Sequence, residues 1–321
     1  MKIQMLAGMI AGACVAADLP EPKFRAVTVD DKIQIGYGVA TADVDGDGKP
    51  DILLADAKQI VWYRNPGWEK FILAENLTRQ DNVCVAARDI DGDGKAEIAV
   101  GAGWAPNDTT GSGAVFYLAA PKDRTQKWEA IALPHVPTIH RMRWVDSPKG
   151  GFELLSVPLH GYGNRNAEGE GVAIMAYRQP ADPRQPWTTN TIAKQWHKTH
   201  NFDHEGKFIW VGAKEGLFQI THSAAGAAIA QLGTNEVGGV GEVRAGKVRG
   251  RLAFLAAIEP MHGTNLAIFT PPFVNAPGNA LWDRRVLDSS LVDGHALACG
   301  DFLGLGRDQI VAGWRAMGGK A

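Results

Sequence analysis

Histidine is the residue type in this chain whose number and placement most suggest chemistry. Five of its nine histidines recur near the ends of paired apolar segments: His140, His160, His200, His262 and His295. An imidazole with an ordinary pKa near about 6.5 transfers protons at neutral pH and, when neutral, binds metal ions. A structural or surface role is the simpler interpretation for any single histidine. A shared position in several repeats instead predicts one common site.

The segment WHKTHNFDH has a spacing that would suit zinc on a helix, with His197, His200 and His204 close together. We expect a strand here. Residues three apart on a strand point to opposite faces, so this spacing predicts no chelate. Only His200 is assigned to the common site.

Two acidic segments are the second candidate for chemistry. Carboxylates fall at positions 1, 3, 5 and 9 of each, with a glycine at position 6: Asp43, Asp45, Asp47 and Asp51 with Gly48, and Asp89, Asp91, Asp93 and Glu97 with Gly94. Calcium takes six to eight oxygen ligands, and a tight glycine-containing turn brings alternate side chains together. Position 12 is Leu54 or Val100 instead of the glutamate of an EF-hand. The pattern predicts two strand-turn-strand calcium sites with a structural role. The alternative is a metal-free Asp/Gly hairpin.

An internal repeat defines the elements that position these residues. GVATADVDGDGKPDILL begins at Gly38 and VCVAARDIDGDGKAEIAV at Val83, so Asp43 and Asp89 are equivalent, 46 residues apart. That period is one four-stranded propeller blade, about 40 to 50 residues long. Degenerate copies without the acidic turn cover residues 140–158, 200–211, 240–258 and 295–313. The fold class is therefore all-β, a β-propeller.

The repeats predict five complete blades and the first two strands of a sixth. We expect residues 24–30 to form an outermost strand without a blade of its own. Because an N-terminal strand commonly completes the last blade of a closed ring, the expectation is a propeller of about seven blades, with the C-terminal blade missing.

The predicted blades bring one set of residues to the mouth of a central channel. The first strand of each blade ends at the position of the acidic turn, and the second strand runs back from it. The starts of the first strands and the ends of the second strands therefore meet on the face opposite the acidic turns. The predicted rim contains Tyr37, Asn82, Trp104, His140, His160, His200, Asn201, Glu259, His262, His295 and Arg315.

Motifs at this rim resemble a known family. They are IHRMRWVD (139–146), PLHGYG (158–163), THNF (199–202), EPMHGTN (259–265), and GHALACGD with AGWR (294–301 and 312–315). Over residues 24 to 315 the chain resembles FG-GAP/VCBS-repeat propellers. At the rim it resembles the propeller of aldos-2-ulose dehydratases and rhamnose-glucuronate lyases. The resemblance implies seven blades, with the chemistry at the central channel.

Both activities are β-eliminations, which need a base, an acid for the leaving group, and a cation or arginine to stabilise the enolate. The resemblance implies His160 or His140 as base and acid, and Arg143 or Arg315 against the carboxylate. The remaining predicted substrate-binding residues are Trp104, Tyr162, His200, Asn201, Glu259, His262 and His295. His200, His262 and His295 are assigned to sugar hydroxyls or to a second divalent cation in the channel.

Two other functions stay open at this point. One is a non-catalytic propeller that binds carbohydrate or protein, in which the rim histidines are structural or bind a ligand. The other is a glycoside hydrolase, which would need two suitably spaced carboxylates, whereas Glu259 is the only acid of the predicted rim.

Composition limits the class of protein. With 45% hydrophobic and 21% charged residues, the chain can fold as one large domain or two small ones, and disorder is excluded. A net charge of −2 and no run of basic residues argue against nucleic-acid binding.

The N-terminus points to export. Residues 1–17 have the pattern of a signal peptide, with a weak alternative of lipoprotein processing at Cys14, and 18–321 are assigned to the propeller. No other segment is predicted to span a membrane. We expect Cys84 and Cys299 to be buried, unpaired thiols, with a disulfide between them as the alternative.

Overall fold

The computed structural model describes residues 23–272 and 280–315. The predicted signal peptide and Cys14 lie outside the described residues. Within these residues the chain is all-β, without a helix, and it forms antiparallel sheets whose strands follow chain order. This confirms the predicted fold class.

Five sheets have four strands, and a sixth has two. The first is β1 (Gly38–Ala42), β2 (Asp51–Ala55), β3 (Gln59–Arg64) and β4 (Glu69–Glu75). The second is β5 (Cys84–Arg88), β6 (Glu97–Ala102), β7 (Ala114–Ala119) and β8 (Glu129–Leu133). The third is β9 (Ile139–Asp146), β10 (Phe152–Pro158), β11 (Ile174–Arg178) and β12 (Thr188–Ala193). The fourth is β13 (Thr199–Glu205), β14 (Phe208–Ala213), β15 (Gly216–Ser223) and β16 (Gly226–Gly233). The fifth is β17 (Val243–Val248), β18 (Arg251–Glu259), β19 (Asn265–Thr270) and β20 (Asp283–Asp288). The sixth is β21 (Gly294–Gly300) and β22 (Gln309–Trp314).

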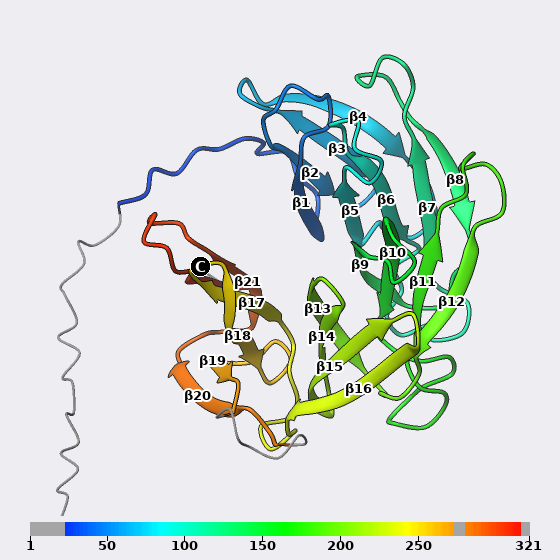
Figure 1. Cartoon of the computed structure of the whole chain (residues 1–321). Helices are drawn as coiled ribbons and strands as arrows, with labels where there is room; N and C mark the ends of the chain where they lie inside the picture. The colour runs from blue at the N-terminus through cyan, green and yellow to red at the C-terminus, as the bar shows by residue number, and fades with distance from the viewer. Residues whose placement is uncertain (1–22, 273–279, 316–321) are drawn as a thin grey trace, which may run out of the picture.

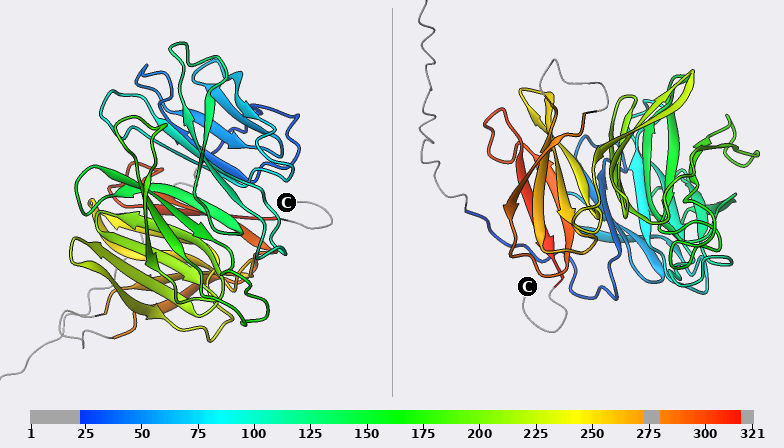
Figure 2. Two further views of the ribbon diagram at one scale, coloured as in Figure 1. Left: turned by 90° about the vertical axis from the view of Figure 1, so that its right-hand side faces the viewer. Right: turned by 90° about the horizontal axis from the view of Figure 1, so that it is seen from below.

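The sheets are propeller blades arranged around a central axis (Figure 1). The first strand of each blade is innermost, because β1, β5, β9, β13, β17 and β21 contact one another in that order. In Figure 1 the arc stays open between β1 and the pair β21 and β22, and in Figure 2 the blades stand side by side. The expected total of about seven blades stays a prediction.

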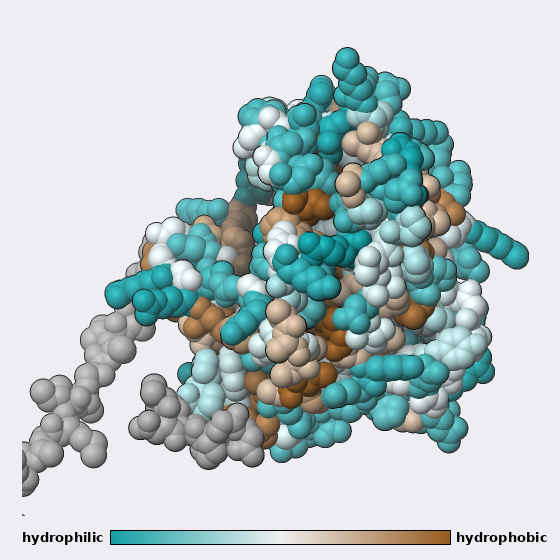
Figure 3. Space-filling model, turned by 45° about the vertical axis from the view of Figure 1, so that its right-hand side comes forward, coloured by the Kyte–Doolittle hydropathy of each residue, from teal (hydrophilic) through white to brown (hydrophobic). Residues whose placement is uncertain are grey.

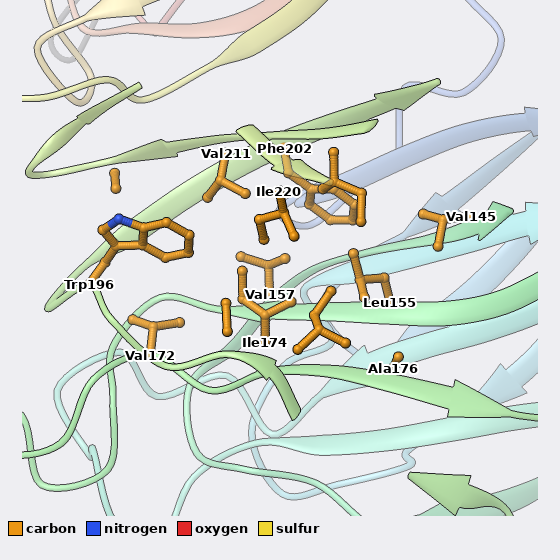
Figure 4. Close-up of a cluster of buried hydrophobic side chains, with 14 residues drawn as sticks. Val145, Leu155, Val157, Val172, Ile174, Ala176, Trp196, Phe202, Val211 and Ile220 are labelled. Carbon is orange, nitrogen blue, oxygen red and sulfur yellow. The ribbon is translucent and has the colours of Figure 1, made fainter. Parts of the chain in front are cut away.

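Adjacent blades are joined by clusters of buried apolar side chains. Figure 4 shows the cluster between the third and fourth blades, where Val157 and Ile174 pack near Phe202, Val211 and Ile220. Successive residues of a strand point to opposite faces, and in β14 every residue from Ile209 to Ala213 is buried, so this blade packs both of its faces against neighbouring blades. The face drawn in Figure 3 is largely hydrophilic, with hydrophobic residues gathered in small patches.

The prediction of a strand over residues 24–30 is wrong, because this stretch has no strand to pair with. It is attached to the first blade through side chains instead. The Asp30 carboxylate accepts hydrogen bonds from the Tyr63 hydroxyl at 2.6 Å and from Lys70 Nζ at 2.8 Å. Further along, the buried Asp56 carboxylate accepts backbone N–H groups of residues 34–36.

Cys84 and Cys299 are both free thiols, as expected. Burial raises the pKa of each to about 12, so neither is a thiolate at neutral pH.

Candidate functional site

Four histidines meet at one end of the innermost strands. His140, His200 and His295 are each the second residue of their strands, β9, β13 and β21, and His262 lies in the loop after β18. His200 is the centre: its ring centroid is 4.8 Å from His140, 4.6 Å from His262 and 5.1 Å from His295. We call these four residues the histidine cluster.

Three members of the cluster present nitrogen atoms to one point. Ring nitrogens of His200, His262 and His295 all lie within 4.8 Å of one another. The closest pair is His200 Nε2 and His262 Nε2, at 2.7 Å. His295 Nδ1 is buried and has no hydrogen-bond partner among residues 23–272 and 280–315.

The neighbours of His200 and His262 determine which ring nitrogen of each residue carries the proton. Arg315 Nη2, which can only donate, lies 3.2 Å from His262 Nδ1, so that His262 carries its proton on Nε2. His262 Nε2–H then donates to His200 Nε2. His200 consequently carries its proton on Nδ1, which lies 3.2 Å from Glu242 Oε1. The result is a directed chain of hydrogen bonds from Arg315 through His262 to His200, whose Nδ1 faces the Glu242 carboxylate without a well-aligned hydrogen bond.

Glu242 is the buried acid of the site, and the sequence analysis missed it. Its side chain is 2% exposed, and it accepts a hydrogen bond from Asn201 Nδ2 at 2.6 Å. Burial alone would raise the pKa of this carboxyl group. The neighbouring His200 and Arg244 outweigh burial and hold the pKa well below its usual range, so Glu242 is ionised.

The histidines are neutral at physiological pH. Burial, followed by the nearby His200, lowers the pKa of His262 to about 4 and that of His295 to about 3. Burial also lowers the pKa of His140 and, against the opposing effect of Glu242, that of His200. Neutral imidazoles keep the lone pair that metal ligation and base catalysis require.

A strained turn presents His262 to the cluster. His262 has a φ of +53°, a left-handed conformation that a non-glycine residue adopts only when its surroundings enforce it. Gly263 follows, and a Cβ at Gly263 would lie 2.2 Å from the Glu259 carbonyl carbon. The turn from Glu259 to Gly263 is therefore closed too tightly for any other residue at 263.

His140 is oriented differently from the other three. Its Nδ1 lies 2.9 Å from the His200 carbonyl oxygen, which only accepts, so Nδ1 carries the proton and Nε2 the lone pair. Its ring stacks on Trp104 with centroids 4.9 Å apart, and Tyr37 stands edge-on to Trp104 at 6.5 Å. These contacts fix one face and one edge of the imidazole.

The remaining predicted rim residues lie elsewhere. His160 and Tyr162 line a separate pocket of about 400 Å³ with Glu170 and Lys194. Glu259 is fully buried and forms an ion pair with Arg284 of β20, at 2.7 Å from Nη2. Asn82 donates to the Asp56 carbonyl oxygen and joins the first two blades. Strand ends alone did not reveal these local partners.

The two acidic turns share one hydrogen-bond pattern at their first and last positions. Asp43 accepts the N–H groups of Gly46 and Gly48, as Asp89 does from Gly92 and Gly94. Ligand oxygens of Asp43, Asp45 and Asp51 lie within 4.8 Å of one another, and those of Asp89, Asp91 and Glu97 do the same.

The middle acids of these turns are turned outward. Asp47 pairs with Lys49 at 2.7 Å, and Asp93 accepts the backbone N–H of Lys95. Burial, followed by the nearby Asp91, raises the pKa of Glu97 to about 7, and burial raises that of Asp51.

A third turn shows what the fold itself requires. Asp301 accepts the N–H groups of Leu305 and Gly306, with Gly304 and Gly306 at positive φ, as in the acidic turns. Positions 3, 5 and 9 are Leu303, Leu305 and Gln309. The same turn thus forms without the additional acids, so folding alone does not explain the carboxylates of the first two turns.

The fold and the turns define a β-propeller whose blades carry a repeated Asp/Gly turn. The FG-GAP-like repeat model matches residues 43–100, and the FG-GAP repeat model matches residues 85–118. The chain is a β-propeller, and its first two blades carry FG-GAP repeats. No curated protein matches it.

Several solved structures are similar to this chain at low identity. A luciferin-regenerating enzyme is 12% identical, with a TM-score of 0.41, over 79% of this chain and 80% of that chain. Hydrazine synthase of Kuenenia stuttgartiensis is 10% identical, with a TM-score of 0.37, over 78% and 80%. The PQQ-bound aldose sugar dehydrogenase of Streptomyces coelicolor is 12% identical, with a TM-score of 0.29, over 79% and 96%. These identities assign no activity to this chain.

Within the described part of the chain, no helix is long and apolar enough to cross a membrane.

Proposed function

We propose that this propeller is a secreted carbohydrate lyase or dehydratase, which performs β-elimination on a uronate or a ketosugar at the histidine cluster. The observation that supports this most is the convergence of His200, His262 and His295 beside the neutral His140. β-Elimination requires a base with a free lone pair and a positive centre near the developing enolate. Export is part of the proposal because FG-GAP repeats are typical of extracellular proteins.

A divalent cation fits the three nitrogens. Imidazole suits Zn²⁺ and related transition metals, and the buried, unpartnered Nδ1 of His295 is the kind of atom that a metal ion satisfies. Glu242, 3.2 Å from His200 Nδ1, would orient His200 and increase its basicity. When bound, the cation would supply a Lewis acid for the carboxyl or carbonyl group of the sugar.

Binding would require a small rearrangement of the His262 turn. Two ligands of a tetrahedral zinc at about 2.0–2.1 Å are separated by roughly 3.3 Å. His200 Nε2 and His262 Nε2 are 2.7 Å apart and share a proton. That proton must move from His262 Nε2 to Nδ1, which would require Arg315 to turn its N–H away from Nδ1.

His140 is the base that the geometry favours. Its Nε2 lone pair is available, since Nδ1–H is held by the His200 carbonyl group. Trp104 covers one face of the His140 ring and keeps it in place. His160, the other residue implied by the resemblance, lines a separate pocket with Tyr162, and we do not assign it to this step. Arg315, 3.2 Å from His262 Nδ1, would hold the His262 turn.

We further propose that the two acidic turns bind Ca²⁺ as structural sites. Three carboxylate residues converge in each turn, and the related turn at Asp301 forms without the additional acids. A cation would remove the repulsion that the converging carboxylates otherwise cost.

The test is turnover by the protein loaded with Zn²⁺, on a rhamnose-capped glucuronide and on 1,5-anhydrofructose, followed by ultraviolet absorbance of the conjugated product. We expect His140→Ala to lower turnover by about 10²- to 10⁴-fold, as removal of a general base does. The matched variant His160→Ala should keep activity within a few-fold. Saturable sugar binding without any product would overturn the lyase proposal in favour of a binding propeller.

A further inference from the structure

A basic pocket lies inside the central channel, next to the histidine cluster. Its volume is about 410 Å³, and it is lined by His295 and Glu242 together with Arg141, Arg143 and Arg244. Arg141 and Arg143 are on the innermost strand β9, and Arg244 is on the innermost strand β17. Residues two apart on a strand face the same side, so β9 directs both guanidinium groups into the channel.

These three arginines are incompletely paired. Neither Arg141 nor Arg143 forms an ion pair within residues 23–272 and 280–315, and Arg244 lies 3.6 Å from Glu242. The two acids close to them are already engaged. Glu242 accepts from Asn201 and faces His200, and Asp203 accepts the backbone N–H of Ala245.

Most guanidinium donors of the pocket are free to bind a ligand. Each guanidinium has five N–H donors. Arg141 donates to the His140 carbonyl oxygen at 2.9 Å, and Arg143 makes one long contact with Asn201 Oδ1 at 3.4 Å. Arg244 donates to its neighbour's carbonyl oxygen at 2.6 Å.

The electrostatics of the pocket favour an anion. Burial, followed by the charge of Arg244, lowers the pKa of Arg143 to about 10, and burial lowers that of Arg141. Like charges at this depth destabilise the ligand-free protein. With Glu242 and Asp203 counted, the three arginines leave one uncompensated positive charge.

We infer that Arg141, Arg143 and Arg244 bind an anionic group of the substrate, a carboxylate or a sulfate ester on a saccharide, beside the histidine cluster. The inference rests on the proposed function for the identity of the ligand as a saccharide. It makes acidic saccharides the substrate class and excludes a neutral ketosugar as the preferred substrate. Arginine binds such oxyanions through paired N–H donors.

The experiment measures binding to three probes by calorimetry at fixed ionic strength: glucuronate, glucose and glucose 6-sulfate. Wild type should bind glucuronate or glucose 6-sulfate at least about 10-fold more tightly than glucose, and the stronger of the two identifies the anion. Arg143→Gln and Arg244→Gln should each weaken binding of that anion by about 10- to 100-fold and leave glucose unchanged. Arg184→Gln, which removes an exposed arginine paired with Glu129, is the charge-matched control and should change neither.

Thermal melting separates ligand binding from a structural role. Removal of one of several like charges should leave the melting temperature of Arg143→Gln equal to or above that of wild type. Equal affinity for glucose and both anions, or loss of folding in both arginine variants, would overturn the inference. Tight binding of an acidic sugar without product would overturn the lyase proposal and leave the anion pocket intact. Turnover of 1,5-anhydrofructose that the arginine variants leave unchanged would support the lyase proposal and overturn the anion pocket.

Discussion

Replacement of Glu242 by glutamine removes one charge from the centre of the site and leaves its shape unchanged. Glu242 faces His200 Nδ1 at 3.2 Å and Arg244 Nη2 at 3.6 Å, and it accepts from Asn201 Nδ2 at 2.6 Å. All three neighbours are donors. A glutamine has one acceptor oxygen and an NH₂ group, so at least one donor would face another donor.

The expected loss of folding stability follows from the burial of Glu242 and from the number of its contacts. Breaking a buried charge pair by removal of one partner costs about 3–5 kcal/mol, and the partial exposure of Arg244 favours the lower value. For a domain of this size, about 3 kcal/mol lowers the melting temperature by roughly 5 °C. Loss of a carboxylate that orients a metal-binding histidine should also weaken zinc binding by about 10- to 100-fold.

Two measurements check this prediction. Calorimetric melting gives the stability change, and titration of metal-free protein with Zn²⁺ against a competing chelator gives the affinity. Glu205→Gln is the matched control, because Glu205 forms an exposed ion pair with Lys247 and should cost less than about 1 kcal/mol. A zinc affinity for Glu242→Gln within about three-fold of wild type would refute the assigned role of Glu242.

Two further predictions concern the turns and pH. Chelation of Ca²⁺ should lower the melting temperature, since each site adds about 2.7 kcal/mol at 100 times its dissociation constant, and Asp45→Asn with Asp91→Asn should abolish this effect. Burial lowers the pKa of His204, so the unfolded chain takes up a proton at this residue more readily than the folded protein. The free energy of unfolding is therefore highest above the unfolded pKa of about 6.5 and falls as the pH drops, by at most about 1.4 kcal/mol per pH unit. The charged groups that face His204 are Asp203, Arg143, Arg88 and Asp146.

The controls for these predictions are specific. Asp182→Asn, a surface change outside the turns, should keep the full calcium effect, and an equal loss there would contradict the calcium assignment. His204→Gln should reduce, without abolishing, the difference in melting temperature between about pH 7.5 and 5.5, because other buried histidines contribute in the same direction. An unchanged difference would mean that His204 binds a proton equally well in the folded and unfolded protein.

The sequence by itself determined the blades. The period of 46 residues and the apolar strand pairs depend on local propensity and alternation, and these are written in each repeat. The same equivalence predicted that His140, His200 and His295 occupy corresponding strand starts, because each is the second residue of an innermost strand. A local pattern does not show whether a partner strand is available, and for this reason the strand predicted over residues 24–30 does not form in the described structure.

The tertiary structure decided which side chains meet. His262 reaches the cluster through a left-handed turn whose tight closure requires Gly263. Glu259 does not face the cluster because it forms an ion pair with Arg284 of β20. Arg141 and Arg143 on β9 are far in sequence from Arg244 on β17 and from Glu242 just before it, so no local spacing indicates that these groups share one channel. Burial on each strand is set by the blade beside it, and for this reason charge pairing and pKa shifts emerge only when the blades are packed together.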